Sequence, residues 1–306
     1  MSDALARSKP ASTKDGAAVD DRVTPTEPPV RPPAPDPSVK KSAGRAWLRV
    51  SPLVLGLQLA LGVGAIAGWQ LLTQVGVLDT FFFSQPSRVA VRVWEWLTTG
   101  VIYDDLAVTL QETFLALVIG AALGLFVGFL LARVRLLAAV LDPYIKILNA
   151  VPRVVLAPVF LLWFGLGIWS KVAFGVTLVF FVVFFNTYQG VREVSRVLVD
   201  NTRMLGASES QLIRHVFLPS ALTWIFSSLH VSVGFAIVGA VVGEYLGSAK
   251  GIGYVIAQAE GTFDTTGVFA GIVVLSVVVL LVELLVNRVE RRLLRWRPDS
   301  GRTDVA

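Results

Sequence analysis

Side chains able to do covalent chemistry are few in this chain and are nowhere gathered into a reactive set. The sequence has no cysteine and only two histidines, His215 and His230. Thiolate chemistry and a histidine-based metal cage are therefore excluded. We find no clustered acid–base set either. The sequence predicts no catalytic residue, no metal site and no cofactor.

Polar side chains inside long apolar runs are the next candidates, because a polar group in lipid is costly unless it has a use. Each has a structural alternative: a serine can bond a carbonyl of its own helix, His230 can be a packing residue, and Glu244 can sit in the outer headgroup zone. The candidates for lining a path through the membrane are Asn186, Gln189, Ser228, His230, Ser232 and Glu244.

A polar, charged stretch, "MLGASESQLIRHVFLPSA" (Met204–Ala221), separates two of the long apolar runs. Upstream apolar residues recur at helical spacing, and Gly206 is a suitable stop for that helix. Residues 208–211 fit a capping box. A second short helix should follow, with Leu212 on its apolar face, and Pro219 fits the first turn of the next long helix. The sequence predicts a helix, a sharp turn and a helix.

Two uses are open for such a projecting element. It can dock into a groove of another protein, or it can be an amphipathic connector lying on the lipid surface. The residues by themselves favour neither.

Composition identifies the elements that must position these residues. The chain has 306 residues, of which 54% are hydrophobic and 16% charged, whereas about a quarter of a soluble domain is charged. A run of about twenty apolar residues spans a bilayer. We predict an all-α polytopic membrane protein with six transmembrane helices, at about residues 53–73, 110–132, 137–165, 171–191, 219–245 and 267–287.

The third crossing is the least regular, because it contains Asp142, Lys146, Arg153 and three prolines. One kinked span over 137–165 is preferred to an interfacial helix followed by a span. The two basic side chains can snorkel or pair with Asp142, and this is favoured over an anion site.

Charge distribution sets the orientation. With six spans and both termini in the cytoplasm, sixteen of the basic residues from Lys40 onward lie inside and four outside, in agreement with the positive-inside rule. Segment 192–218 is then cytoplasmic. The net charge of +5 reflects the basic residues of the cytoplasmic segments and does not indicate nucleic-acid binding. Pro-rich residues 1–50 and residues 299–306 are predicted to be tails, the first of them disordered.

The stretch "DNTRMLGASESQLIRHVFLPSAL" resembles the EAA loop of permease subunits in binding-protein-dependent ABC importers. Gly206 matches the glycine of that motif, and Leu218 with Pro219 matches its ending. The start of the motif differs in this chain, because residues 200–202 are Asp-Asn-Thr where Glu-Ala-Ala is typical. Asp200 keeps the carboxylate, and the alanine pair is lost.

Four further stretches resemble the nitrate/sulfonate/taurine branch of these permeases. The similarity covers residues 50–298, and it is specific for the family but weak for the substrate. The stretches are "PSRV" (86–89), "NAVPRVVLAPVFLLWFGLG" (149–167), "FFNTYQGVR" (184–192) and "VVGEYLGSAKGIGYVI" (241–256).

The resemblance implies a type I ABC importer (MetI-like) permease fold over residues 51–298, in a multi-pass protein of the prokaryotic cell membrane. It also implies a pair of permeases, expected to be a homodimer, with ATPase subunits inside and a substrate-binding protein outside. The residues expected to couple the chain to the ATPase are Asp200, Arg203, Gly206, Ala207, Ser208, Gln211, Leu212, Leu218 and Pro219.

The function implied is a permease subunit that moves a small solute, with sulfonate-, taurine- or nitrate-type anions first and thiamine-precursor pyrimidines or riboflavin as alternatives. No GxxxxGK[ST] pattern is present, so ATP hydrolysis is expected on a separate polypeptide. The competing function is an ion-coupled secondary transporter working alone. It would need carboxylates in mid-span, and Asp142, Glu244 and Glu283 all lie nearer the ends of their spans.

Overall fold

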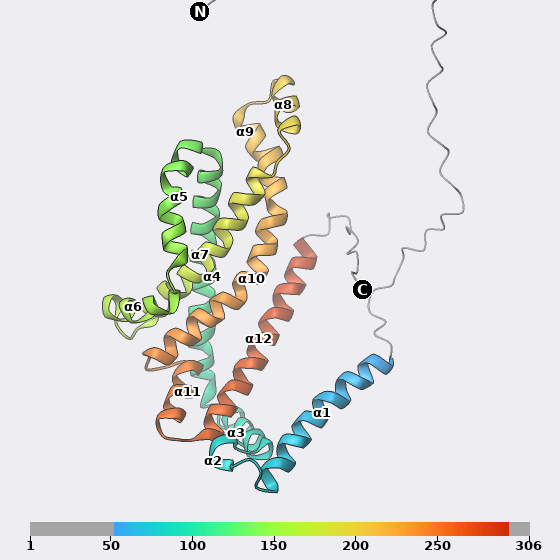
Figure 1. Cartoon of the computed structure of the whole chain (residues 1–306), viewed down its shortest axis with the longest axis vertical. Coiled ribbons are helices and arrows are strands. Elements are labelled where there is room, and N and C mark those ends of the chain that lie inside the picture. The colour runs from blue at the N-terminus through green and yellow to red at the C-terminus, as the bar shows by residue number, and fades with distance from the viewer. Residues whose placement is uncertain (1–51, 294–306) are drawn as a thin grey trace, which may run out of the picture. The chain divides into compact units, whose positions relative to one another are not determined.

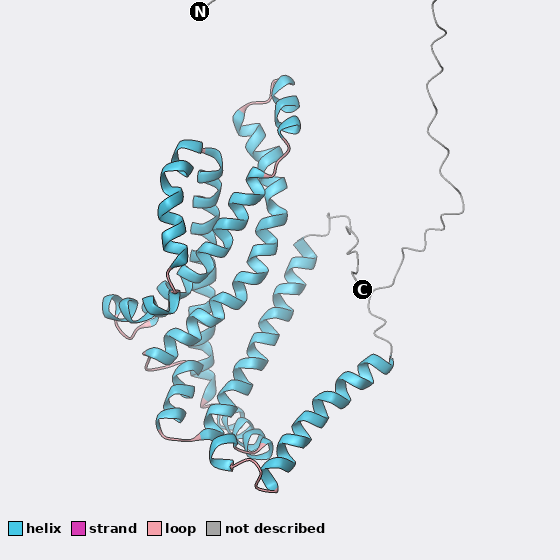
Figure 2. Cartoon of the chain, viewed as in Figure 1, coloured by secondary structure: helices cyan, strands magenta, loops and turns pink. Residues whose placement is uncertain are grey.

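The computed structural model describes residues 52–293, and every regular element in that part of the chain is a helix (Figure 2). The described residues from Gly56 onward belong to one compact unit. The tails predicted at 1–50 and 299–306 lie outside the described residues.

The elements follow the apolar runs of the sequence, with shorter helices between them. In order, they are α1 (Pro52–Gln74), α2 (Thr80–Phe83), α3 (Pro86–Thr99), α4 (Ile102–Arg133), α5 (Arg135–Ala150), η1 (Arg153–Leu156), α6 (Ala157–Phe164), α7 (Ile168–Arg192), α8 (Arg196–Met204), α9 (Glu209–Leu212), η2 (Ile213–Phe217), α10 (Leu218–Leu246), α11 (Ile252–Gly261) and α12 (Thr265–Leu293).

Helices α4, α7 and α10 pack against one another and form the core (Figure 1). Small residues permit close approach of these helices. A Cβ at Gly120 would lie 2.7 Å from the Val179 Cβ, and one at Gly124 would lie 2.8 Å from the Phe180 carbonyl oxygen. A side chain at either glycine would push α4 away from α7, so these glycines have a packing role.

Five described helices are long and apolar enough to cross a membrane: α1, α4, α7, α10 and α12. Helix α5 and the segment Arg153–Phe164 meet at a bend of 88°. If the two parts form one broken span, the number of candidate spans rises to six. The break falls where Pro152 removes a backbone donor. The structure thus has a sharp bend where the sequence predicts a kinked crossing.

Two differences from the predicted elements bear on the site. Helix α4 begins at Ile102 rather than near residue 110, and Asp104 and Asp105 stand in its first turn, where the helix dipole favours acidic side chains. Helix α11 fills the interval between the last two crossings, for which the sequence predicted no helix. Both differences extend the same end of the core.

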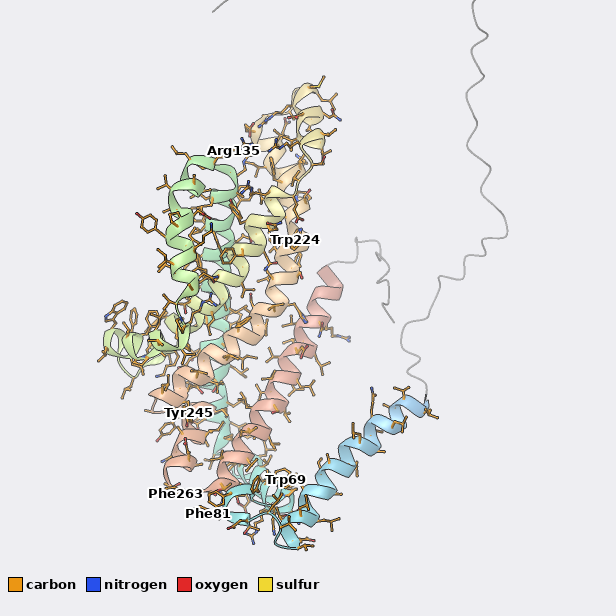
Figure 3. All side chains as sticks on the ribbon, viewed as in Figure 1. Trp69, Phe81, Arg135, Trp224, Tyr245 and Phe263 are labelled. Atoms are coloured by element: carbon orange, nitrogen blue, oxygen red, sulfur yellow. The ribbon has the colours of Figure 1, made fainter. Side chains whose placement is uncertain are left out.

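The ends of the core carry different short elements (Figure 1). Helices α8 and α9 lie at the end where α7 finishes and α10 begins, together with the turn between α4 and α5. Helices α2, α3 and α11 lie at the opposite end. There Phe81 and Phe263 stack with ring centroids 6.3 Å apart (Figure 3).

Candidate functional site

The stretch at 204–221 folds as two short helices joined by a sharp turn, in agreement with the sequence prediction. Helix α8 ends at Met204, and Gly206 has a φ of +83°, a left-handed conformation that glycine adopts without strain. Met204 and Leu205 are 85% and 88% exposed. The turn therefore presents two large apolar side chains at its tip.

The predicted capping box is present at the start of α9. The Ser208 Oγ accepts a hydrogen bond from the Gln211 backbone N–H at 3.3 Å, and the Ser208 N–H donates to the Gln211 Oε1 at 2.8 Å. After Leu212 the chain passes through the π-helical turn η2 directly into α10, with Pro219 in its first turn. Any displacement of α9 is thus passed to a membrane helix without an intervening loop.

A small apolar core lies beneath α8 and α9. Leu212 has no exposed surface, and the half-buried Ala207 packs against the same cluster. The cluster joins the last turn of α7, helix α8, helix α9 and the first turns of α10. Its buried members are Val191, Val199, Leu212, Val216, Phe217, Ala221 and Ile225.

Glu209 ties this element to the end of α4. Its carboxylate accepts hydrogen bonds from Arg203, at 2.7 Å, and from Arg133. The hydrogen bonds from Arg203 and then from Arg133 hold the pKa of Glu209 below its usual value. The Arg133 guanidinium also lies 4.4 Å from the centroid of the Phe217 ring. The sequence analysis did not single out Glu209 or Arg133 as partners, because they are 76 residues apart.

Two of the path candidates line one cavity of about 410 Å³, between α4, α5, α7 and α10. The Asn186 amide donates to the Val182 carbonyl at 2.8 Å, and the Gln189 amide donates to Glu193 at 2.9 Å. Tyr188 and Trp224 add aromatic surface to the same cavity, and Figure 3 shows Trp224 on α10.

The other four candidates all lie on α10 and do not line that cavity. Ser228 is buried and donates to the Ile225 carbonyl at 2.7 Å, which is the bond within its own helix considered as the alternative. Ser232 is fully buried. The His230 ring lies 3.9 Å from the Glu283 carboxylate on α12.

The structure contradicts the interpretation that Glu244 sits in the outer headgroup zone, because this residue is only 1% exposed. Thr109 on α4 donates to its Oε1 at 2.7 Å, and the Gly253 backbone N–H donates to its Oε2 at 2.7 Å. Protein rather than lipid or water surrounds this carboxyl. The path candidates therefore lie in separate places, with Glu244 far from the cavity of Asn186 and Gln189.

Two further ionisable side chains are buried beside Glu244: Glu112 on α4 and Lys171 on α7, each 1% exposed. The Lys171 ammonium donates to the carbonyls of Leu166 and of Gly167, the latter at 3.0 Å. Lys171 is one of the four basic residues counted outside the membrane from the sequence, and no role was predicted for Glu112. A lone acidic residue near the start of a long apolar run was the signal that could have found it.

A second, larger groove of about 1000 Å³ adjoins the first cavity and lies between the α4–α5 turn, the end of α7 and α8. The two share Leu131, Ala138, Asp142 and Tyr188. Asp200 lines this groove rather than the α9 surface, and Arg135 stands at its rim on α5 (Figure 3). Five arginines and two aspartates line it: Arg133, Arg135, Arg192, Arg196, Arg203, Asp142 and Asp200.

Comparison with known proteins gives a consistent result. Residues 120–295 match the family model described as "Binding-protein-dependent transport system inner membrane component". The aliphatic sulfonates transport permease SsuC of Bacillus subtilis is 34% identical, over 85% of this chain and 92% of the relative. The riboflavin transport permease RibX of Chloroflexus aurantiacus is 32% identical, over 81% and 96%.

A third relative and a solved structure extend the comparison. The formylaminopyrimidine transport permease ThiX of Halalkalibacterium halodurans is 33% identical, over 71% of this chain and 86% of the relative. The fold resembles a chain of the inward-facing MetNI methionine ABC transporter, with a TM-score of 0.52 and 20% identity over 64% of this chain and 96% of that one. This likeness shows a shared fold.

Proposed function

The chain belongs to the family of binding-protein-dependent transport system inner membrane components, multi-pass permeases of ABC importers, and on that premise we propose how it works. It carries a small solute through the membrane while a separate subunit hydrolyses ATP. Segment 192–218 transmits the motion of that subunit to α7 and α10.

The α9 element is the observation that carries this proposal. A short helix transmits force only if it is stiff, and α9 is capped at its start, packed from below through Leu212 and continuous with α10. A docking helix also needs an exposed apolar surface, and Met204 and Leu205 supply one. A connector lying on lipid would need neither the capping box nor the packed core.

The partners follow from this role. ATPase subunits bind the α8–α9 tip on the cytoplasmic side, and a substrate-binding protein delivers the solute outside. A second copy of the chain completes the path. Exposed apolar residues on α5 and α6, among them Tyr144, Leu162 and Trp163, provide surface for lipid and for that copy.

We favour an aliphatic sulfonate-type anion as the solute. The relatives named for aliphatic sulfonates, from Bacillus subtilis and Escherichia coli, are 34% and 31% identical. The arginine-rich groove next to the cavity of Asn186 and Gln189 gives an anion a favourable exit, because three of its five arginines, Arg135, Arg192 and Arg196, remain beside its two aspartates when Arg133 and Arg203 bind Glu209. Riboflavin and a pyrimidine remain alternatives, because the relatives named for them are nearly as similar.

The test is uptake by proteoliposomes that contain the chain, its ATPase and its binding protein. We expect ATP-dependent uptake of an alkanesulfonate, with riboflavin and formylaminopyrimidine as competitors that fail to reduce it. Replacing Arg135 and Arg196 together by Gln should lower the rate several-fold, whereas Arg288→Gln, on α12 and outside both the groove and segment 192–218, should leave it unchanged.

Two results would contradict the proposal in different ways. Uptake that persists without the ATPase would favour the ion-coupled transporter. Competition by riboflavin but not by sulfonates would keep the importer and change the solute.

A further inference from the structure

The buried group around Glu244 has no place in the mechanism proposed above. Glu112, Lys171 and Glu244 come from three different core helices, and none is more than 1% exposed. They lie near the end of the core opposite α9, because Glu244 is about 39 Å along α10 from its first residue. Two carboxylates and one ammonium leave an excess negative charge in a water-free site, which is strongly unfavourable.

The contact between the two carboxyl groups resolves this charge excess. Thr109 donates to Glu244, and Glu112 lies three residues after Thr109 on the same face of α4, so the two buried carboxyl groups are neighbours. An ionised carboxylate only accepts hydrogen bonds, so a bond between two carboxyl groups needs a proton on one of them. Glu244 already accepts from Thr109 and from Gly253, which suits the ionised form. Glu112 receives no donor at its Oε2, which suits the protonated form.

We propose that Glu112 and Glu244 form a binding site for one proton, held on Glu112, and that this proton keeps α11 docked on the core. The proton balances the charge: one neutral carboxyl, one carboxylate and the Lys171 ammonium sum to zero. The inference concerns the resting protein and does not rest on the proposed solute or ATPase.

The link to α11 is direct. The three consecutive backbone N–H groups at its start each donate to a side chain of the core: Gly251 to Asp105 at 2.8 Å, Ile252 to Thr109 at 2.9 Å, and Gly253 to Glu244 at 2.7 Å. A Cβ at Gly251 would overlap the carboxyl carbon of Glu244, and one at Gly253 would overlap the Val241 carbonyl oxygen and lie 3.0 Å from the Glu244 Oε2. The Glu244 carboxylate thus occupies the space that Gly251 leaves open, and α10 packs closely against Gly253.

The charged groups around the site come from each packed element. Helix α4 contributes Asp105 and Glu112, α7 contributes Lys171, and α10 contributes Glu244. Helix α11 contributes the positive end of its backbone dipole. Loss of the proton from Glu112 would leave two adjacent carboxylates with only Lys171 and the helix end to balance them. Repulsion between them would push Glu244 away from the α11 N–H groups.

The test is a pH series of melting temperatures on the purified full-length chain in detergent without sodium. We expect the melting temperature of the wild type to fall by several degrees between about pH 6 and about pH 9. Glu112→Gln, whose amide replaces the neutral carboxyl, should lose this dependence and keep its stability at the higher pH. The matched control Glu95→Gln, on an exposed carboxyl of α3, should behave as the wild type does.

A spectroscopic measurement reports the proton itself. The infrared spectrum of the wild type should contain a protonated-carboxyl band at neutral pH that is missing in Glu112→Gln and retained in Glu95→Gln. This band is measured on the wild type first, so a variant that fails to fold does not leave the question open.

Three results would overturn the proposal. The first is a wild type with no protonated-carboxyl band, and the second is a Glu112→Gln variant with the same pH dependence as the wild type. The third is recovery of the high-pH stability by sodium chloride but not by choline chloride, which would assign the site to a metal cation instead of a proton.

Discussion

Helix α9 at one end of the α4–α7–α10 core and helix α11 at the other are both short and both joined to α10, yet they are held in opposite ways. Helix α9 sits on apolar side chains, and its charged contacts, between Glu209, Arg203 and Arg133, lie at the surface. Helix α11 is bound through its backbone N–H groups to the side chains of Asp105, Thr109 and Glu244, in a largely buried site.

The difference matches the roles proposed above for the two ends. Exposed ion pairs contribute little to stability and are easily exchanged, so a partner that docks on α9 can replace them with its own contacts. Buried polar contacts are strong in place and expensive to break. The α9 end is therefore suited to respond to a partner, whereas the α11 end is suited to stay closed until its charges change.

The largest effect expected is at the buried end. Glu244→Ala removes the buried acceptor of the Thr109 hydroxyl and of the Gly253 N–H. A buried donor left without its acceptor costs about 1–3 kcal/mol, so the loss of both bonds should lower the melting temperature of the purified chain by about 10 °C. Glu95→Ala is the matched exposed control. If both variants melt at the same temperature, the two ends do not differ as described.

The next effect is in the apolar core under α9. Leu212→Ala removes a fully buried side chain, at a cost of about 2–5 kcal/mol, and should reduce both the melting temperature and co-purification with the ATPase. Leu205→Ala, at the exposed tip, should reduce co-purification and leave the melting temperature unchanged. Equal loss of stability in the two variants would show that the tip is not a free docking surface.

A smaller effect is expected at the turn. Gly206→Val places a β-branched residue at a φ of +83°, which costs about 1–2 kcal/mol. No atom lies within 4 Å of the added Cβ, so the strain is in the backbone and not from a clash. We expect weaker ATPase binding or ATP hydrolysis that is uncoupled from uptake. Gly206→Asn, which tolerates this conformation, should keep coupled uptake; equal loss in both variants would argue against the backbone explanation.

The smallest effect concerns the surface ion pair. The pKa of Glu209 is lowered by Arg203 and Arg133, so this contact is fully formed above the ordinary glutamate pKa and is lost only as pH falls through the lowered value. Spin labels at Leu136→Cys and Ser210→Cys, in a chain that has no native cysteine, should report one unchanged distance from pH 8 down to about pH 5.

The distance distribution of those labels should broaden only in stronger acid. With Glu209→Gln added, it should be broad at every pH. A narrow distribution in that variant would mean that the apolar core alone fixes α9 against α4.

Local signals in the sequence were sufficient at the α9 end. The glycine stop at Gly206, the capping box from Ser208 and the proline at 219 act within a few residues of one another, so their outcome depends little on the rest of the chain. The lengths of the apolar runs likewise predict the crossing helices, because bilayer thickness sets them. The bend between α5 and α6 was predicted as a kink within 137–165, from the prolines there, but its angle of 88° was not.

Local sequence signals did not predict the contacts at the α11 end. Glu112, Lys171 and Glu244 are far apart in the sequence. Each lies near the end of a predicted span, where a charged residue is ordinarily explained as a loop charge or a headgroup contact. Only the packing of α4, α7 and α10 brings them together. Helix α11 itself starts with glycines that read as a loop, and its N–H groups are satisfied by side chains from other helices.

The sequence by itself determined that this chain crosses the membrane several times and has a capped helix–turn–helix between two crossings, because hydropathy and capping act over short stretches of chain. The tertiary structure alone decided which charges are buried and what they hold. A charge's environment depends on the helices that surround it, and those helices meet only when the core packs.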